Sequence, residues 1–120
     1  MKILIVDDSR AMRMIVRRTL RQAGYEAHTV IEAASGAEAL GSVREMQPDL
    51  ILCDWNMPEM SGIEVLETLK NEGNRVKFGF VTSESSADMR ARAMQAGADF
   101  LVTKPFTPEA LQSVLEPILG

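Results

Sequence analysis

The stretch LILCDWNMPEMSG, residues 50–62, contains the most informative strand signal in the chain. An apolar run, Leu50–Cys53, stops at a carboxylate, Asp54, and the chain's single tryptophan, Trp55, follows it. Short apolar runs without polar alternation are typical of strands that are buried on both faces of a sheet. The stretch therefore predicts a buried strand that ends in a lone acid.

Four more apolar runs occur along the chain, and each of the five is followed by helical periodicity. The predicted strands are residues 2–6, 27–33, 50–53, 77–81 and 100–102. Parallel strands need a crossover connection, which is usually a helix. We therefore expect a single α/β domain, residues 1–120, with a five-stranded parallel sheet flanked by five helices.

Helix boundaries are marked by residues that satisfy free backbone groups. The first helix has one apolar stripe that includes Met12 and Val16, and Gly24 ends it. Two later helices begin with the spacing of a capping box, and the last with threonine before proline. These start signals are Ser35 with Glu38, Ser61 with Glu64, and Thr107 with Pro108.

Composition restricts the class of protein. The chain has 120 residues, a net charge of -4 and 46% hydrophobic residues, which is ordinary for a globular protein and argues against general nucleic-acid affinity. No apolar segment approaches the roughly 20 residues that span a bilayer. Cys53, the single cysteine, has no partner for a disulfide. We expect a cytoplasmic protein that binds neither nucleic acid nor membrane.

Polar residues follow four of the five predicted strands. Because the carboxyl ends of parallel strands share one edge, these side chains should meet in the crevice where open α/β sheets bind ligands. The second strand ends in Ala33 and Ala34, which suggests that it lies to one side. The polar ends are Asp7 and Asp8, Asp54, Thr82 with Ser83, and Thr103 with Lys104.

Three clustered carboxylates favour a bound cation, because their mutual repulsion otherwise raises at least one pKa. A set of oxygen ligands with room for water and a phosphate oxygen suits Mg²⁺ better than Ca²⁺. A lysine ammonium and a threonine hydroxyl can serve the remaining phosphate oxygens, and a carboxylate can act as the nucleophile.

Four motifs, which occur in order, resemble those of response-regulator receiver domains, above all the single-domain chemotaxis regulators. They are VDDS, DWNMPEMSG, VTSE and AGADFLVTKPF, and the resemblance spans essentially the whole chain. It implies a doubly wound, flavodoxin-like sheet with strand order 2-1-3-4-5. It also implies a switch that phosphorylates and dephosphorylates itself and is not otherwise an enzyme.

The resemblance assigns roles at the predicted site. Asp54 would accept a phosphoryl group from a sensor histidine kinase, a histidine phosphotransfer protein or a small acyl phosphate. Asp8 and Asp54 would bind Mg²⁺ directly with the backbone carbonyl of Asn56, and Asp7 largely through water. The remaining implied roles are phosphate binding and switching by Thr82 and Lys104, a cis peptide at Pro105, and control of phosphate lifetime by Asn56 and Glu84.

One position departs from the family pattern. Receiver domains usually have an aromatic residue three positions before the lysine of the last strand, where this chain has Leu101. Phe100 is one residue earlier, and a one-residue offset in a strand points the side chain to the opposite face. Output would then depend on movement of the fourth helix, within a face formed by that helix, the fifth strand and the fifth helix.

Several interpretations remain open. The domain could be a monomeric or weakly dimeric motility signal for a target such as the flagellar motor switch, a phosphate sink, or a receiver from a longer chain with a DNA-binding or enzymatic domain. An aspartyl-phosphate phosphatase would have its two first acids one residue apart, whereas Asp7 and Asp8 are adjacent. A dinucleotide-binding module would have a glycine-rich turn there. The arginines of the first helix are either a solvated face or a kinase contact.

Overall fold

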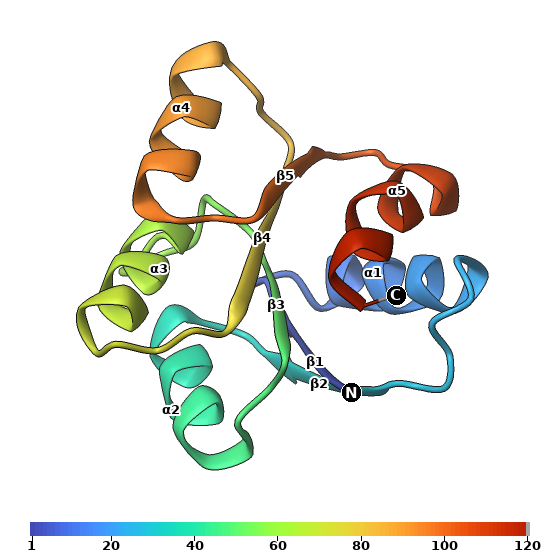
Figure 1. The fold of residues 1–120 in the computed structure, drawn as a ribbon, viewed down its shortest axis with the longest axis horizontal. Helices are drawn as coiled ribbons and strands as arrows, with labels where there is room; N and C mark the ends of the chain where they lie inside the picture. The colour runs from blue at the N-terminus through green and yellow to red at the C-terminus, as the bar shows by residue number, and fades with distance from the viewer. Residues whose placement is uncertain (120) are drawn as a thin grey trace.

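The computed structural model describes residues 1–119 and has an α/β architecture in which strands and helices alternate (Figure 1). The strands are β1 (Lys2–Val6), β2 (Thr29–Ala33), β3 (Leu50–Cys53), β4 (Lys77–Thr82) and β5 (Phe100–Thr103). The helices are α1 (Arg10–Gln22), α2 (Gly36–Met46), α3 (Gly62–Asn71), α4 (Ala87–Ala96) and α5 (Pro108–Leu119). All pairings are parallel and the strand order is β2-β1-β3-β4-β5, which confirms the predicted fold.

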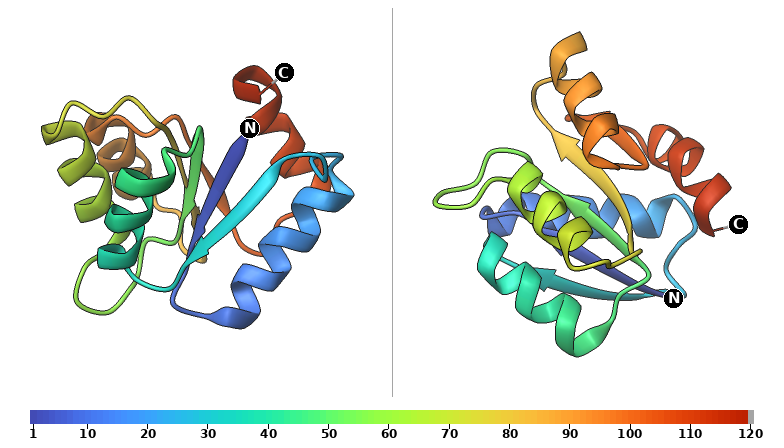
Figure 2. Two further views of the ribbon diagram at one scale, coloured as in Figure 1. Left: turned by 90° about the horizontal axis from the view of Figure 1, so that it is seen from below. Right: turned by 60° about the vertical axis from the view of Figure 1, so that its left-hand side comes forward.

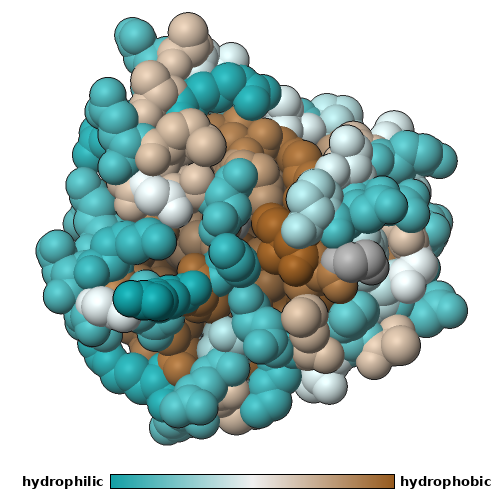
Figure 3. Space-filling model, in the orientation of Figure 1, coloured by the Kyte–Doolittle hydropathy of each residue, from teal (hydrophilic) through white to brown (hydrophobic). Residues whose placement is uncertain are grey.

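Helices cover both faces of the sheet. In Figures 1 and 2, α1 and α5 lie on one face, and α2, α3 and α4 lie on the other. The period of two along each strand divides the core accordingly: Phe78 and Phe80 of β4 belong to the α2–α3–α4 side, and Val81 belongs to the α1–α5 side. On the face seen in Figure 3, hydrophobic residues gather near the centre and mostly hydrophilic residues surround them.

Three predicted strand boundaries are wrong. The second strand begins at Thr29 and not at residue 27, because the His28 N–H donates to the Tyr25 carbonyl in a turn and ladder bonding starts when the Thr29 N–H donates to Met1. The fourth and fifth strands each run one residue further than predicted. Thr82 and Thr103 are still register partners, so the ladder continues through both.

Side-chain caps start the helices where the sequence predicts them. The Ser61 hydroxyl and the Glu64 carboxylate form a complete capping box at α3, and the Thr107 hydroxyl accepts the Ala110 N–H at α5. At α2 only half of the predicted box forms, because the Glu38 carboxylate accepts the Ala34 N–H and not that of the cap residue. Among the helices described, none has the length and apolar character needed to cross a membrane.

Candidate functional site

The carboxyl ends of the central strands bring three acids together. Asp7 and Asp8 come directly after β1, and Asp54 comes directly after β3, its neighbour in the sheet. Carboxylate oxygens of all three residues lie within 4.8 Å of one another. Acids that are distant in the sequence therefore form one cluster, as the strand ends predict.

Lys104 connects this cluster to the end of β5. Its Nζ donates to Asp7 Oδ2 at 3.0 Å and lies 3.6 Å from Asp54 Oδ1. The other oxygen of Asp7, Oδ1, accepts the Ser9 N–H at 2.9 Å. Both oxygens of the buried Asp7 carboxylate are therefore engaged, whereas Asp8 is exposed and accessible to a ligand.

Asp54 is held in an environment that disfavours its charge. Burial raises the pKa of Asp54, the Lys104 ammonium opposes that shift, and the Asp7 and Asp8 carboxylates add to it. A cation bound among the three acids would lower the pKa of Asp54 again, because it favours the ionised form of each carboxylate. The Asp54 side chain is 12% exposed, so a small reactant can still reach it.

The donor set fits a hard divalent cation. Every candidate ligand atom in the cluster is a carboxylate oxygen, which is the donor type that Mg²⁺ prefers. The neighbouring Cys53 is not a ligand: its buried thiol donates to the Asp54 backbone carbonyl at 3.2 Å, and burial raises the pKa of the thiol far above its usual value. Cys53 belongs to the core, as expected.

The loop after β3 is held against Asp54 by a glycine that the sequence analysis did not single out. Gly62 N–H donates to the Trp55 carbonyl at 2.8 Å. A Cβ at Gly62 would overlap the Asp54 carbonyl oxygen and would lie 3.0 Å from the Phe80 ring. The close approach of the two backbones therefore requires glycine at this position, which fixes where the loop carrying Asn56 returns to the fold.

Trp55 lies beside the cluster and packs into the core. Its ring is tilted by 40° against the Phe80 ring, with 4.7 Å between the ring centroids. Trp55 is half-buried next to Asp54, so its fluorescence can report changes at the acid cluster.

Thr82 places a hydroxyl at the end of β4. The residue is fully buried, and its hydroxyl oxygen accepts the Glu84 N–H at 3.3 Å. Glu84 and Asn56 are both exposed on the loops around the cluster. The Lys104–Pro105 peptide bond is cis, which is the geometry that the resemblance implies.

The two residues at the atypical aromatic position lie on opposite faces of β5. Leu101 packs with Phe80 on the α2–α3–α4 side, the side of Thr82, and is 7% exposed. Phe100 is in the core on the α1–α5 side, where its ring fills the space beside Gly79. The one-residue offset therefore places Phe100 on the face opposite Leu101, as predicted.

Two further residues support the cluster without standing out in the sequence. Ser9 caps α1 through the Met12 N–H and donates its own N–H to Asp7. Arg13 donates from Nη1 to the Asp7 carbonyl at 2.7 Å. A serine before a helix can be recognised in the sequence as a helix cap. Nothing in the sequence distinguishes Arg13 from the other four arginines of α1.

Comparisons with known proteins agree with this geometry. A family model described as the response regulator receiver domain matches residues 3–116. Chemotaxis protein CheY1 of Helicobacter pylori is 36% identical over 123 residues, which cover 100% of this chain and 98% of that protein. A CheY homolog of Campylobacter jejuni is 37% identical, with 100% and 93% covered. The structure of Vibrio cholerae chemotaxis protein CheY4 matches with a TM-score of 0.86 at 35% identity, over 98% of each chain.

Proposed function

The chain belongs to the response regulator receiver domain family, and on that premise we propose that it is the phosphoacceptor switch of a two-component phosphorelay. The observation that carries the proposal is the cluster of Asp7, Asp8 and Asp54 with Lys104 beside it. Such a set combines a nucleophile, a cation site and a counter-charge for phosphate oxygens. Family members of this kind are signalling switches and not classical enzymes.

Asp8, Asp54 and the backbone carbonyl of Asn56 would hold Mg²⁺, and Asp7 would act on it through water. When bound, the ion neutralises negative charge on the transferred group and on the carboxylates. Asp7 is suited to an indirect role because both of its oxygens already accept hydrogen bonds. Exposed Asp8 has no such restriction.

In the transfer step, a carboxylate oxygen of Asp54 would attack the phosphorus of the donor. An O–P bond forms at Asp54 and the P–N bond to the donor histidine breaks, so the histidine nitrogen leaves with the electron pair. Lys104 would balance charge on a phosphoryl oxygen from its place beside Asp54.

After the transfer, Thr82 would turn its hydroxyl toward the phosphoryl group, which requires the hydroxyl to leave its present contact with the Glu84 N–H. Asn56 and Glu84 would influence how fast water removes the phosphoryl group.

An apolar hollow next to Lys104 favours a protein as the phosphodonor. Its lining combines side chains of α1 with those of the loops that follow β4 and β5, namely Met12, Ile15, Ser83, Lys104, Pro105 and Phe106. Ile15 is 46% exposed. A sensor histidine kinase or a histidine phosphotransfer protein could bury this surface, whereas a small acyl phosphate could not.

Output would pass through the face formed by α4, β5 and α5. The structure describes the whole of α4, and Ala93 is its one buried residue. A weakly anchored helix can change position at low cost. Because Leu101 occupies the usual aromatic position, we infer that α4 moves when Thr82 turns, and that a partner which prefers the phosphorylated form shifts the population toward it.

Relatives named as chemotaxis proteins favour a role in motility control. In that role the chain would act in the cytoplasm as a monomer or weak dimer, and its target would be a protein such as the flagellar motor switch. A phosphate sink, or a receiver within a longer regulator, is the second candidate. Adjacent Asp7 and Asp8 disfavour the phosphatase alternative.

Mass spectrometry after incubation with Mg²⁺ and acetyl phosphate tests the proposal. The wild-type chain should gain one phosphoryl group and change its Trp55 fluorescence, and Asp54→Asn should do neither. Gain of phosphate by Asp54→Asn, or no gain by the wild type with either acetyl phosphate or a phosphorylated histidine protein, would contradict the assignment.

A further inference from the structure

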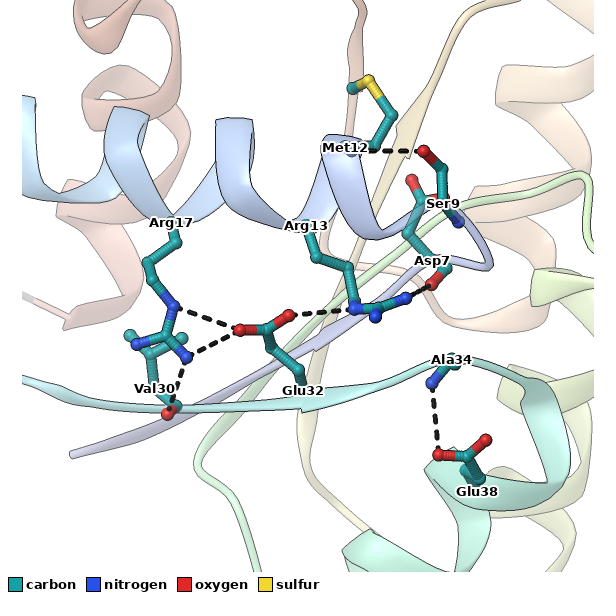
Figure 4. Close-up of polar contacts among 9 residues, drawn as sticks. All are labelled: Asp7, Ser9, Met12, Arg13, Arg17, Val30, Glu32, Ala34 and Glu38. Carbon is teal, nitrogen blue, oxygen red and sulfur yellow. Dashed lines mark hydrogen bonds and ion pairs between the residues drawn. The ribbon is translucent and has the colours of Figure 1, made fainter.

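Arg13 of α1 connects the edge strand β2 to the acid cluster, as Figure 4 shows. Its Nη1 donates to the Asp7 backbone carbonyl at 2.7 Å, and its Nε donates to Glu32 Oε1 on β2 at 2.9 Å. The Arg13 side chain is 14% exposed. One guanidinium therefore joins a carboxylate on the outermost strand to the backbone of the residue that begins the site.

The Asp7 carbonyl needs this donor because it lies where the sheet ends. The Asp7 N–H still donates to the Ala33 carbonyl at 3.2 Å, as a continuation of the β1–β2 pairing. Beyond Ala33 the neighbouring chain turns into α2, so β2 supplies no N–H for the next carbonyl. Asp7 is buried, and a buried polar backbone group without a partner destabilises the fold.

The orientation of this carbonyl also restricts the orientation of Asp8. The Asp7 carbonyl and the Asp8 nitrogen belong to the same planar peptide unit. A hydrogen bond that fixes the oxygen fixes this plane, which includes the Asp8 Cα, so that only rotation about the φ of Asp8 still varies the direction of its side chain. Asp8 is the exposed acid of the cluster, and the hydrogen bonds that hold Asp7 do not hold its side chain.

Glu32 holds Arg13 in this position. Its Oε1 accepts from Arg13, while its Oε2 accepts from Arg17 Nε at 3.2 Å and from Arg17 Nη2 at 2.8 Å. Burial raises the pKa of Glu32, but the hydrogen bonds from the two arginines outweigh it, and the net pKa is lowered. The carboxylate is therefore charged at neutral pH and fixes the guanidinium from the side opposite the site.

We propose that Arg13 is a positioning residue for the cation site: through the Asp7 carbonyl it fixes the peptide plane that orients Asp8, and Glu32 acts through it. The inference rests on the proposed function, because it concerns the same Mg²⁺ site. Mg²⁺ demands nearly ideal octahedral geometry, so it tolerates a misdirected carboxylate poorly. Residues that orient metal ligands from outside typically contribute 10–100-fold to affinity.

The sign of the effect separates positioning from simple electrostatics. Removing the positive charge of Arg13 near a dication site would by itself tighten Mg²⁺ binding, since a repulsive charge is lost. Loss of positioning weakens binding instead. Arg17 is the matched control, because it has the same charge, the same helix and the same carboxylate partner, but it donates to Glu32 and to the Val30 carbonyl and not to Asp7.

Calorimetric titration with Mg²⁺ tests the proposal on the intact chain. Arg13→Ala should raise the Kd for Mg²⁺ about tenfold, whereas Arg17→Ala should leave it near the wild-type value or lower it. Glu32→Ala should weaken binding more in the wild-type background than in Arg13→Ala, where only the loss of its negative charge still acts, since its positioning contribution passes through Arg13. With saturating Mg²⁺, the acetyl phosphate reaction of Arg13→Ala should return toward the wild-type rate.

A measurement without metal completes the test. Amide hydrogen exchange at Asp8 and Ser9 should be faster in Arg13→Ala than in Arg17→Ala, and Arg13→Lys, which can reach one of the two partners at a time, should lie between Arg13→Ala and the wild type. Equal or tighter Mg²⁺ binding by both Arg13 variants, beside normal binding by the wild type, would overturn the inference alone. Absence of Mg²⁺ binding by the wild type would overturn the proposed function and this inference with it.

Discussion

The replacement of Gly62 by alanine should destabilise the protein and disturb Asp54. Gly62 is the first residue of α3 and is buried. The added Cβ would overlap the Asp54 carbonyl oxygen and would lie 3.0 Å from Phe80 Cε1. Neither neighbour can yield easily, because one is backbone at the end of β3 and the other is a fully buried ring. The loop after β3 must therefore move.

Two opposing effects set the magnitude. Overpacking of a well-packed core costs about 1–3 kcal/mol, while alanine in place of glycine gains at most about 1 kcal/mol inside a helix and less in its first turn. We expect a net loss of about 2 kcal/mol in the free energy of unfolding, or roughly 8 °C in melting temperature for a domain of this size. Phosphorylation of Asp54 should also become slower, because its carbonyl is displaced.

Gly41→Ala is the matched control. Gly41 lies in the middle of α2, and a Cβ there meets no atom within 4 Å. This variant should gain about 1 kcal/mol, since only helix propensity changes. Urea denaturation of both variants measures the difference. A Gly62→Ala chain as stable as the wild type, or a shift of the same sign in both variants, would refute the steric argument.

Other changes have equally definite expected results. In metal-free buffer at pH 7, Asp54→Asn should raise the melting temperature, because burial raises the pKa of Asp54 in the folded state and the ionised form is disfavoured there. That gain should vanish below about pH 4, where the unfolded carboxyl is protonated as well, and melting curves against pH check it. Glu59→Gly should gain about 1 kcal/mol in urea denaturation, because Glu59 has a φ of 68° that glycine adopts without strain. Phe100→Ala should lose about 3 kcal/mol in the same assay, because the ring fills the space beside Gly79.

Local signals predicted most of the fold. The apolar runs placed the five strands, caps marked the starts of α2, α3 and α5, and the alanines after β2 indicated its edge position. The predicted start of β2 was two residues too early. Residues 27 and 28 have strand-like neighbours, but the His28 N–H donates to the Tyr25 carbonyl in a turn. The strand propensity of a residue does not indicate which hydrogen-bond partner its backbone N–H has in the folded protein.

The acids of the candidate site were predictable for a related reason. Parallel strands place all their carboxyl ends at one edge, so Asp7, Asp8 and Asp54 had to be near one another once the strands were identified. The one-residue offset between Phe100 and Leu101 was predictable as well, since alternation along a strand is a local rule.

The amino-acid sequence was therefore enough to predict the order of the elements, the edge at which the acids gather and the alternation of strand residues between faces, because these follow from periods of two and 3.6 residues and from chain direction. The contacts of particular atoms, in contrast, arise only when the elements pack. Lys104 reaches Asp7 across 97 positions, Arg13 supplies the donor that the Asp7 carbonyl lacks, and Gly62 admits the Asp54 backbone. Such contacts depend on how packed elements approach one another, and no periodicity encodes that approach.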